Sequence, residues 1–204
     1  MAPAAANLTW SCDCGNVKAK ISALPTLNFD CHCHSCVAPA RYIAEKYSTN
    51  SNNTPMLNPS TGGAGVSIFP ARTVESFTSL KDEATGETKI KFVKVGETGK
   101  ATRCYTTCCG TQVSNFLAPG IIALNRSGLK NEDGSKFEPS GDLMNIMAKH
   151  AFEPDKVPEP KVPNVPLGVL GNFLWLLAFG SGLKAKFPEL FNAEKDAEVV
   201  PITW

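Results

Sequence analysis

The feature that most constrains this chain is the placement of its eight cysteines. They fall in short clusters, and none follows Cys109. A disulfide framework usually spreads its cysteines along the chain, and near neighbours such as Cys12 and Cys14 cannot easily bond to each other. Closely spaced thiols are typical of metal sites. The sequence therefore predicts that most of these cysteines bind metal ions.

The densest cluster is a C-x-C-x-x-C motif formed by Cys31, Cys33 and Cys36. Three thiolates this close together can surround one ion, and soft sulfur ligands select zinc over magnesium or calcium. Three protein ligands leave one position of a tetrahedral zinc open, as in catalytic sites, whereas a fourth ligand from elsewhere would close the site. The spacing leaves both arrangements open, and an iron–sulfur cluster is a weaker alternative.

The candidate ligands of a second site come from two distant segments: Cys12, Cys14, Cys104, Cys108 and Cys109. Two cysteine-bearing turns that meet across a fold make a closed four-cysteine zinc site. Gly15 and Gly110 suit the tight turns that such ligands need. The alternative is that these cysteines are reduced side chains buried in a β core.

Charge and terminal composition limit the partners and the compartment. Lys plus Arg number 20 against 19 for Asp plus Glu, which argues against a nucleic-acid binder. The first ten residues lack the basic and apolar regions of a secretory signal. We therefore expect a cytoplasmic protein whose thiols stay reduced, which favours zinc over disulfides.

The apolar run over 166–183 is the one segment that invites a membrane interpretation. It contains Pro166, Asn172 and several glycines, so it is too interrupted for the roughly 20 apolar residues of a spanning helix. We predict a buried or docking helix and no transmembrane span. The alternative is a peripheral membrane contact through Trp175, Lys184 and Lys186.

Short apolar or alternating segments predict a mainly β fold. The expected strands are 17–21, 66–69, 89–95, 102–106 and a broken strand over 113–124. Residues 48–65 form a long polar loop of the kind that often serves as a lid.

The remainder of the chain differs in composition. Leu143, Ile146, Met147 and His150 lie on one helix face, and a proline-rich linker over 154–166 precedes the apolar run. We therefore divide the chain into a flexible leader over 1–9, a zinc-binding β domain over 10–130, and a C-terminal extension with one or two helices over 131–204.

Together these motifs resemble the glutathione-dependent formaldehyde-activating enzyme family, which also contains centromere protein V. The resemblance rests on Cys-x-Cys-Gly, then C-x-C-x-x-C, then Cys-Gly-Thr, and covers about 12–125. It implies a β-tent fold of small antiparallel sheets, with a structural zinc at Cys12, Cys14 and the Cys108–Cys109 region. It also implies a catalytic zinc at the C-x-C-x-x-C motif. Thr106 stands where the family pattern has a cysteine, so the fourth structural ligand is open between Cys104 and Cys108.

The same resemblance implies carbon–sulfur bond chemistry on a small-molecule substrate, such as an adduct of glutathione with formaldehyde. The departures from the family pattern suggest a divergent member with a different substrate. Two alternatives are a zinc lyase, isomerase or cyclase of specialised metabolism that does not use glutathione, and a non-catalytic zinc module that binds a protein.

An enzyme of this kind needs a general acid or base and a means of holding the substrate. The candidates for proton transfer are His34, His32 and Tyr105. The simpler interpretation of the two histidines is that they hydrogen-bond around the site or face solvent. The candidates for binding a substrate carboxylate are Arg41, Arg72 and Arg103.

Overall fold

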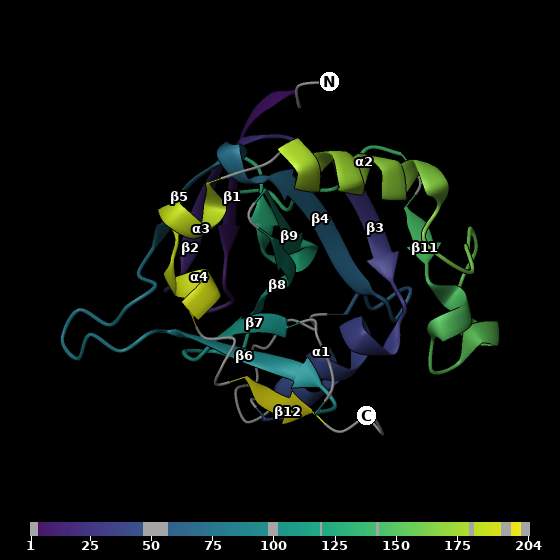
Figure 1. Ribbon diagram of the computed structural model, residues 1–204, viewed down its shortest axis with the longest axis horizontal. Helices are drawn as coiled ribbons and strands as arrows, with labels where there is room; N and C mark the ends of the chain where they lie inside the picture. Colours follow the sequence, from purple (N-terminus) through teal and green to yellow (C-terminus); the bar gives the residue numbers. More distant parts are fainter. Residues whose placement is uncertain are drawn as a thin grey trace.

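The computed structural model describes residues 4–46, 57–97, 102–118, 120–141, 143–179, 182–192 and 197–200. Over these residues the chain is mainly β and forms a four-stranded and an eight-stranded sheet (Figure 1). The strand segments expected over 17–21, 66–69, 89–95 and 102–106 are confirmed with small shifts of their ends.

The smaller sheet has the strand order β10-β1-β2-β5, and its pairings are antiparallel. Its strands are β1 (Ala5–Ser11), β2 (Lys18–Ala23), β5 (Val74–Thr78) and β10 (Leu129–Lys130). Along β2, Lys18 and Lys20 are exposed while Ala19 and Ile21 are buried. This alternation gives the sheet one solvated face and one face against the core.

The larger sheet has the order β11-β3-β4-β9-β8-β7-β6-β12. Its strands are β3 (Leu27–Cys31), β4 (Ala64–Pro70), β6 (Ile90–Val95), β7 (Thr102–Thr106), β8 (Gln112–Ala118), β9 (Ile121–Asn125), β11 (Met144–Ile146) and β12 (Glu198–Val200). Every residue of β4 and β9 is buried, as expected for central strands covered on both faces. The edge strands β11 and β12 pair in parallel with β3 and β6, so residues after 130 complete this sheet at both edges.

Helices cover the sheets on several sides. The α-helices are α1 (His34–Lys46), α2 (Leu167–Phe179), α3 (Leu183–Lys186) and α4 (Glu189–Asn192). The short 3-10 helices are η1 (Ala71–Thr73), η2 (Arg126–Gly128), η3 (Ala148–His150) and η4 (Pro154–Lys156). α1 begins three residues after β3 ends and buries Ala38, Ala40 and Ile43 in one apolar cluster with Tyr105 and Val200. A second apolar cluster contains both Cys31 and Cys36, so the end of β3 and the start of α1 pack together.

The apolar run over 166–183 contains helix α2, which lies across β4 and β3 in Figure 1. Val169 and Phe173 pack against the apolar cluster of β3 and β4. Leu167 and Leu174 on the outer side are 84% and 54% exposed. No helix among the described residues has both the length and the apolar character needed to cross a bilayer.

Three segments differ from the sequence-based expectation. Residues 5–9, assigned to a flexible leader, belong to β1, which pairs on both sides with β2 and β10. Residues 143–151, expected as a helix, form β11 and η3, because pairing with β3 outweighs the local helical pattern and Met147 adopts a left-handed backbone conformation. Helix α1 was not expected at all. Of the loop over 48–65, residues 48–56 lie outside the described part of the chain.

Trp10 joins the two sheets. Its ring is fully buried, and its Nε1–H donates a 2.9 Å hydrogen bond to the carbonyl of Asn125 at the end of β9. Gly128 lies directly against this contact, since a Cβ there would come within 2.6 Å of both Trp10 Nε1 and the carbonyl oxygen of Ser11. The packing at this junction therefore requires a residue without a side chain.

We predict that Gly128→Ala lowers the free energy of unfolding by about 1–3 kcal/mol, the usual cost of overpacking a core. Gly168→Ala is the matched control, because its Cβ would meet nothing within 4 Å. An alanine in this exposed turn of α2 should instead stabilise by about 0.5–1 kcal/mol. Urea unfolding of the two variants measures both effects, and equal stability of the pair would contradict the prediction.

Candidate metal centres

The first candidate centre is built by two turns from distant parts of the chain. Cys12 and Cys14 lie in the turn between β1 and β2, and Cys108 and Cys109 lie in the turn between β7 and β8. The four sulfur atoms lie within 4.8 Å of one another. Gly15 and Gly110 directly follow the cysteines with φ values of +76° and +73°, which glycine adopts without strain.

The sulfur separations fit a tetrahedral thiolate centre. A metal–sulfur distance of about 2.3 Å places tetrahedral sulfurs about 3.8 Å apart. The contacts are 3.2 Å for Cys14–Cys108, 3.5 Å for Cys12–Cys14, and 3.8 Å for both Cys12–Cys108 and Cys108–Cys109. The donor set and its geometry therefore fit one metal ion held by four thiolates, with Cys108 as the ligand that the sequence left open.

Neighbouring donors already point at these sulfurs. The backbone N–H of Val17 lies 3.2 Å from Cys12 Sγ, and the hydroxyl oxygens of Thr111 and Thr106 lie 3.2 and 3.5 Å from Cys109 Sγ. Hydrogen bonds from Cys108 and Cys12 lower the pKa of the Cys109 thiol. Such donors favour the charged thiolate form that binds metal.

The second candidate centre is local. Cys31 ends β3, Cys33 precedes α1, and Cys36 lies in the first turn of that helix. The three sulfurs lie within 4.8 Å of one another, and those of Cys31 and Cys33 are 3.4 Å apart. The backbone N–H groups of Cys36 and Val37 both donate to the carbonyl of Cys33, which fixes the turn. A helix N-terminus also favours negative charge.

The trio is more deeply buried than the four-cysteine group. Cys31 and Cys36 are 5% and 8% exposed, and Cys33 is half-buried. Hydrogen bonding with Cys31 and Cys33, aided by Arg103, holds the pKa of the Cys36 thiol well below its ordinary value. Hydrogen bonding to Cys33 and Cys36, together with burial, raises the pKa of Cys31. Without a cation, therefore, only part of the trio can ionise, and a metal ion would replace the remaining protons.

Each of the two histidines in the motif contacts a side chain from a distant part of the chain. His32 is buried, and its Nε2 lies 2.9 Å from the side-chain oxygen of Asn145 on β11. The ring also fills the space over Gly63, where a Cβ would lie 2.7 Å from Nε2. His34 stacks on Phe152 with ring centroids 3.8 Å apart. Neither Asn145 nor Phe152 carried a signal in the sequence, because tertiary pairing brings them to the site.

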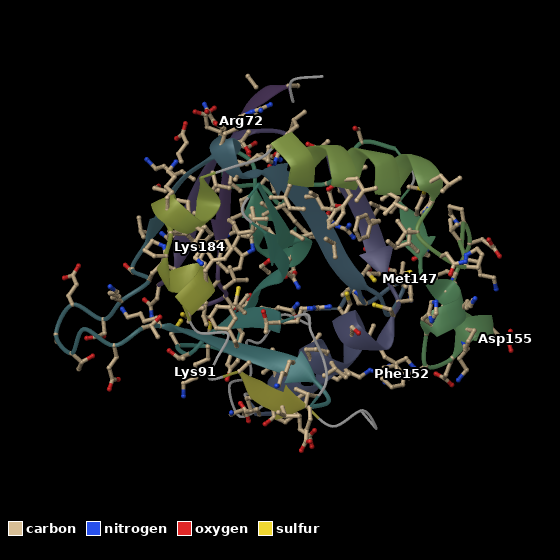
Figure 2. The ribbon with its side chains drawn as sticks, viewed as in Figure 1. Arg72, Lys91, Met147, Phe152, Asp155 and Lys184 are labelled. Atoms are coloured by element: carbon tan, nitrogen blue, oxygen red, sulfur yellow. The ribbon has the colours of Figure 1, made fainter. Side chains whose placement is uncertain are left out.

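A cavity of about 190 Å³ lies next to the trio, between α1 and residues 151–157. Its walls include His32, Val37, Arg41, Phe152 and Lys156. Figure 2 shows Phe152 beside α1. The Arg41 guanidinium lies 4.8 Å above the Phe152 ring. No cysteine is among the described residues that line the cavity, although His32 and Val37 directly adjoin the ligands in sequence.

Asp30 holds another part of the cavity lining in place. It is fully buried, pairs with Arg126, and accepts hydrogen bonds from Asn58 at 2.6 Å and Thr61 at 2.7 Å. Thr61 and the adjacent Gly62 line the cavity. The buried carboxylate therefore fixes the described end of the long loop next to Cys31.

The other predicted site residues lie elsewhere. Tyr105 is fully buried beneath α1, with its hydroxyl 3.4 Å from Glu198. Cys104 belongs to neither sulfur group, and burial raises the pKa of its thiol to about 12. Arg72 lies in η1, far from α1 in Figure 2. Arg103 is 5% exposed and contacts Cys36, so its place is inside the protein beside the trio.

A scan against protein-family models finds no match for this chain, and a search of curated proteins finds no significant match. The family resemblance of the cysteine motifs therefore stays a prediction.

We predict two zinc ions per chain in protein purified without added metal. Cys33→Ala should lower the content to one, because two thiolates hold zinc poorly. Cys104→Ala is the matched control and should retain both ions, since Cys104 lies outside both groups. Elemental analysis of the purified variants measures this, and a Cys33→Ala protein that still holds two ions would contradict a metal site at the trio.

We also predict that Asp30→Asn destabilises the protein by about 3–5 kcal/mol, because it leaves the charge of Arg126 buried without a counter-ion. Asp155→Asn is the control, an exposed carboxylate of η4 whose loss should cost less than about 0.5 kcal/mol. Urea unfolding of the zinc-loaded variants compares them. Equal stability would show that the Asp30–Arg126 pair is not needed to hold the loop.

Proposed function

We propose that the protein is a zinc-dependent, carbon–sulfur lyase-like enzyme that acts on a thiol adduct, such as an adduct of glutathione, or on a small carbonyl compound. The observation that carries the proposal is the unequal number of ligands. One group offers four thiols, whereas the trio offers three among the described residues. Structural zinc sites use four protein ligands, and catalytic sites keep one position for water or substrate.

The donor set favours zinc for both centres. All seven candidate ligands are thiols, and soft sulfur donors select zinc over the hard cations magnesium and calcium. Zinc held by the trio would lower the pKa of a substrate thiol or hydroxyl, or polarise a carbonyl. The group formed by Cys12, Cys14, Cys108 and Cys109 would be structural, because its four thiols complete a tetrahedral shell.

The residues around the cavity have chemistry that suits such a substrate. Arg41 and Lys156 place positive charge on its wall, and Glu153, which pairs with Lys156 at 2.5 Å, also lines it, so the surplus positive charge is that of Arg41. These charges favour a carboxylate, a group that glutathione carries twice. His34 is the better candidate for proton transfer, because Asn145 already engages Nε2 of His32. Tyr105 is excluded from this role by its burial beneath α1.

The resemblance to the glutathione-dependent formaldehyde-activating family supports the same reaction class. The cavity of about 190 Å³ is smaller than the roughly 300–1,000 Å³ typical of ligand pockets, which favours a small substrate or the reactive end of a larger one. None of the eight cysteines forms a disulfide, which fits a reducing compartment. We therefore propose that the enzyme lies in the cytoplasm.

A second candidate is a non-catalytic zinc module. It is favoured by the absence of cysteines from the described lining of the cavity and by the exposed leucines of α2. An apolar outer helix face is typical of a surface that docks onto a partner. The two candidates differ in a property that can be measured: the enzyme needs an exchangeable fourth ligand at the trio, whereas the non-catalytic module does not.

We predict that the zinc-loaded protein accelerates the formation and cleavage of thiol–aldehyde adducts. Glutathione with formaldehyde and smaller thiol–aldehyde pairs are the substrates to test, with exchange rates followed by NMR. Cys33→Ala should lower the rate at least about a hundredfold, because losing a Lewis acid removes several kcal/mol of transition-state stabilisation. Cys104→Ala should keep the wild-type rate. Full zinc occupancy with no acceleration of any adduct would favour the non-catalytic module.

A further inference from the structure

We propose that Arg103 is the charge partner of the three-cysteine centre and allows it to take an anionic fourth ligand, namely a substrate thiolate. The inference rests on the proposed function in that the trio must hold a divalent cation with an exchangeable position. It adds to the proposed function the residue, Arg103, that lets this position accept a negatively charged ligand.

The position of Arg103 is unusual for an arginine. It lies on β7, is 5% exposed, and places its Nη2 3.7 Å from Cys36 Sγ. Its only other described hydrogen bond runs from Nη1 to the carbonyl of Thr102 at 3.3 Å. No carboxylate among the described residues forms an ion pair with it. A buried arginine without a carboxylate is costly unless another negative charge compensates it.

The trio supplies that charge. Three thiolates and one divalent cation carry a net charge of −1, and the guanidinium carries +1. The centre and Arg103 together are therefore neutral, which offsets part of the cost of burying either one. Without Arg103, a thiolate in the fourth position would raise the buried charge to −2. With Arg103 present, the same ligand leaves −1, so binding of an anion becomes much less unfavourable.

One donor of Arg103 also remains available. Its Nε is buried and has no hydrogen-bond partner among the described residues. An unsatisfied buried donor carries a free-energy penalty that a ligand with lone pairs can relieve. The guanidinium thus brings positive charge to the trio through its contact with Cys36, and its Nε–H is not already committed to another acceptor.

The four-cysteine centre provides a contrast within the same chain. Four thiolates around a divalent cation carry −2, yet no arginine or lysine side chain among the described residues hydrogen-bonds to these sulfurs. Cys14 is exposed and Cys108 is half-buried, so water can solvate this charge. In the part of the chain that the structure describes, a cationic side chain contacts a candidate ligand sulfur only at the centre that is buried and one thiolate short, as expected if its task is to balance the charge of an exchangeable ligand.

Cobalt substitution gives a readout that does not depend on activity. Protein loaded with Co²⁺ at both centres is titrated with 2-mercaptoethanol, which binds as the thiolate and releases its proton to the buffer, and separately with neutral imidazole. The visible spectrum reports each ligand that enters the cobalt shell. We expect Arg103→Met to weaken thiolate binding about tenfold or more, while imidazole affinity changes less than about threefold.

Three variants separate charge from shape. Arg103→Lys keeps the charge and should bind thiolate close to wild type, whereas Arg103→Gln keeps a donor but no charge and should behave like Arg103→Met. Arg72→Met is the control, an exposed arginine of η1 that should change neither affinity. If Lys loses thiolate binding as fully as Met, or if Met binds it as wild type does, the proposal is overturned.

The remaining outcomes are also decisive. If wild-type cobalt protein binds neither thiol nor imidazole, the trio has no exchangeable position and the proposed function fails. If it binds both and the Arg103 variants bind thiol equally well, only this inference fails. If only Arg103→Lys folds, its thiolate affinity decides: a value close to wild type supports the charge role, and a loss of tenfold or more overturns the inference.

Discussion

Seven thiols crowd into two small volumes, and this crowding is the constraint on which the rest of the structure depends. Within each group the sulfurs lie within 4.8 Å of one another, so they cannot all ionise unless a cation lies between them. In the first group this requirement joins the β1–β2 turn to the β7–β8 turn, and with it the smaller sheet to the larger one. Trp10 reinforces the same junction through its hydrogen bond to Asn125. A cation at this position would therefore act as a cross-link between the two sheets.

The second group uses the same chemistry in a different setting. It forms within six residues, at the passage from β3 to α1, and needs no distant cysteine. What comes from a distance is its environment. Asn145 engages His32, Phe152 stacks on His34, and Arg103 contacts Cys36. These contacts bury the trio, fix its histidines and supply a positive charge, so the two centres differ less in their ligands than in what surrounds them.

The segment after residue 130 is part of this environment. β11 pairs in parallel with β3 and carries Asn145, and the chain that follows forms one wall of the cavity through Phe152 and Lys156. Another part of the wall is held by Asp30, which accepts hydrogen bonds from Asn58 and Thr61. A cysteine motif that could bind metal by itself is thereby placed beside an open pocket, and this placement gives the proposed enzyme somewhere to hold a substrate.

The sequence by itself determined the mainly β character of the fold, the three-cysteine group and all but one member of the four-cysteine group, because strand alternation and ligand spacing are local properties. It also indicated most of the strands before residue 128 and the turns at Gly15 and Gly110. Only the tertiary structure selected Cys108 over Cys104, placed Arg103 against Cys36 and turned residues 144–146 into a strand. Those outcomes depend on which distant segments meet. Cys104 lies on β7 and Cys108 lies in the turn that follows it. The sequence does not distinguish the two, because the folded backbone decides which sulfur faces the other ligands and which faces the core.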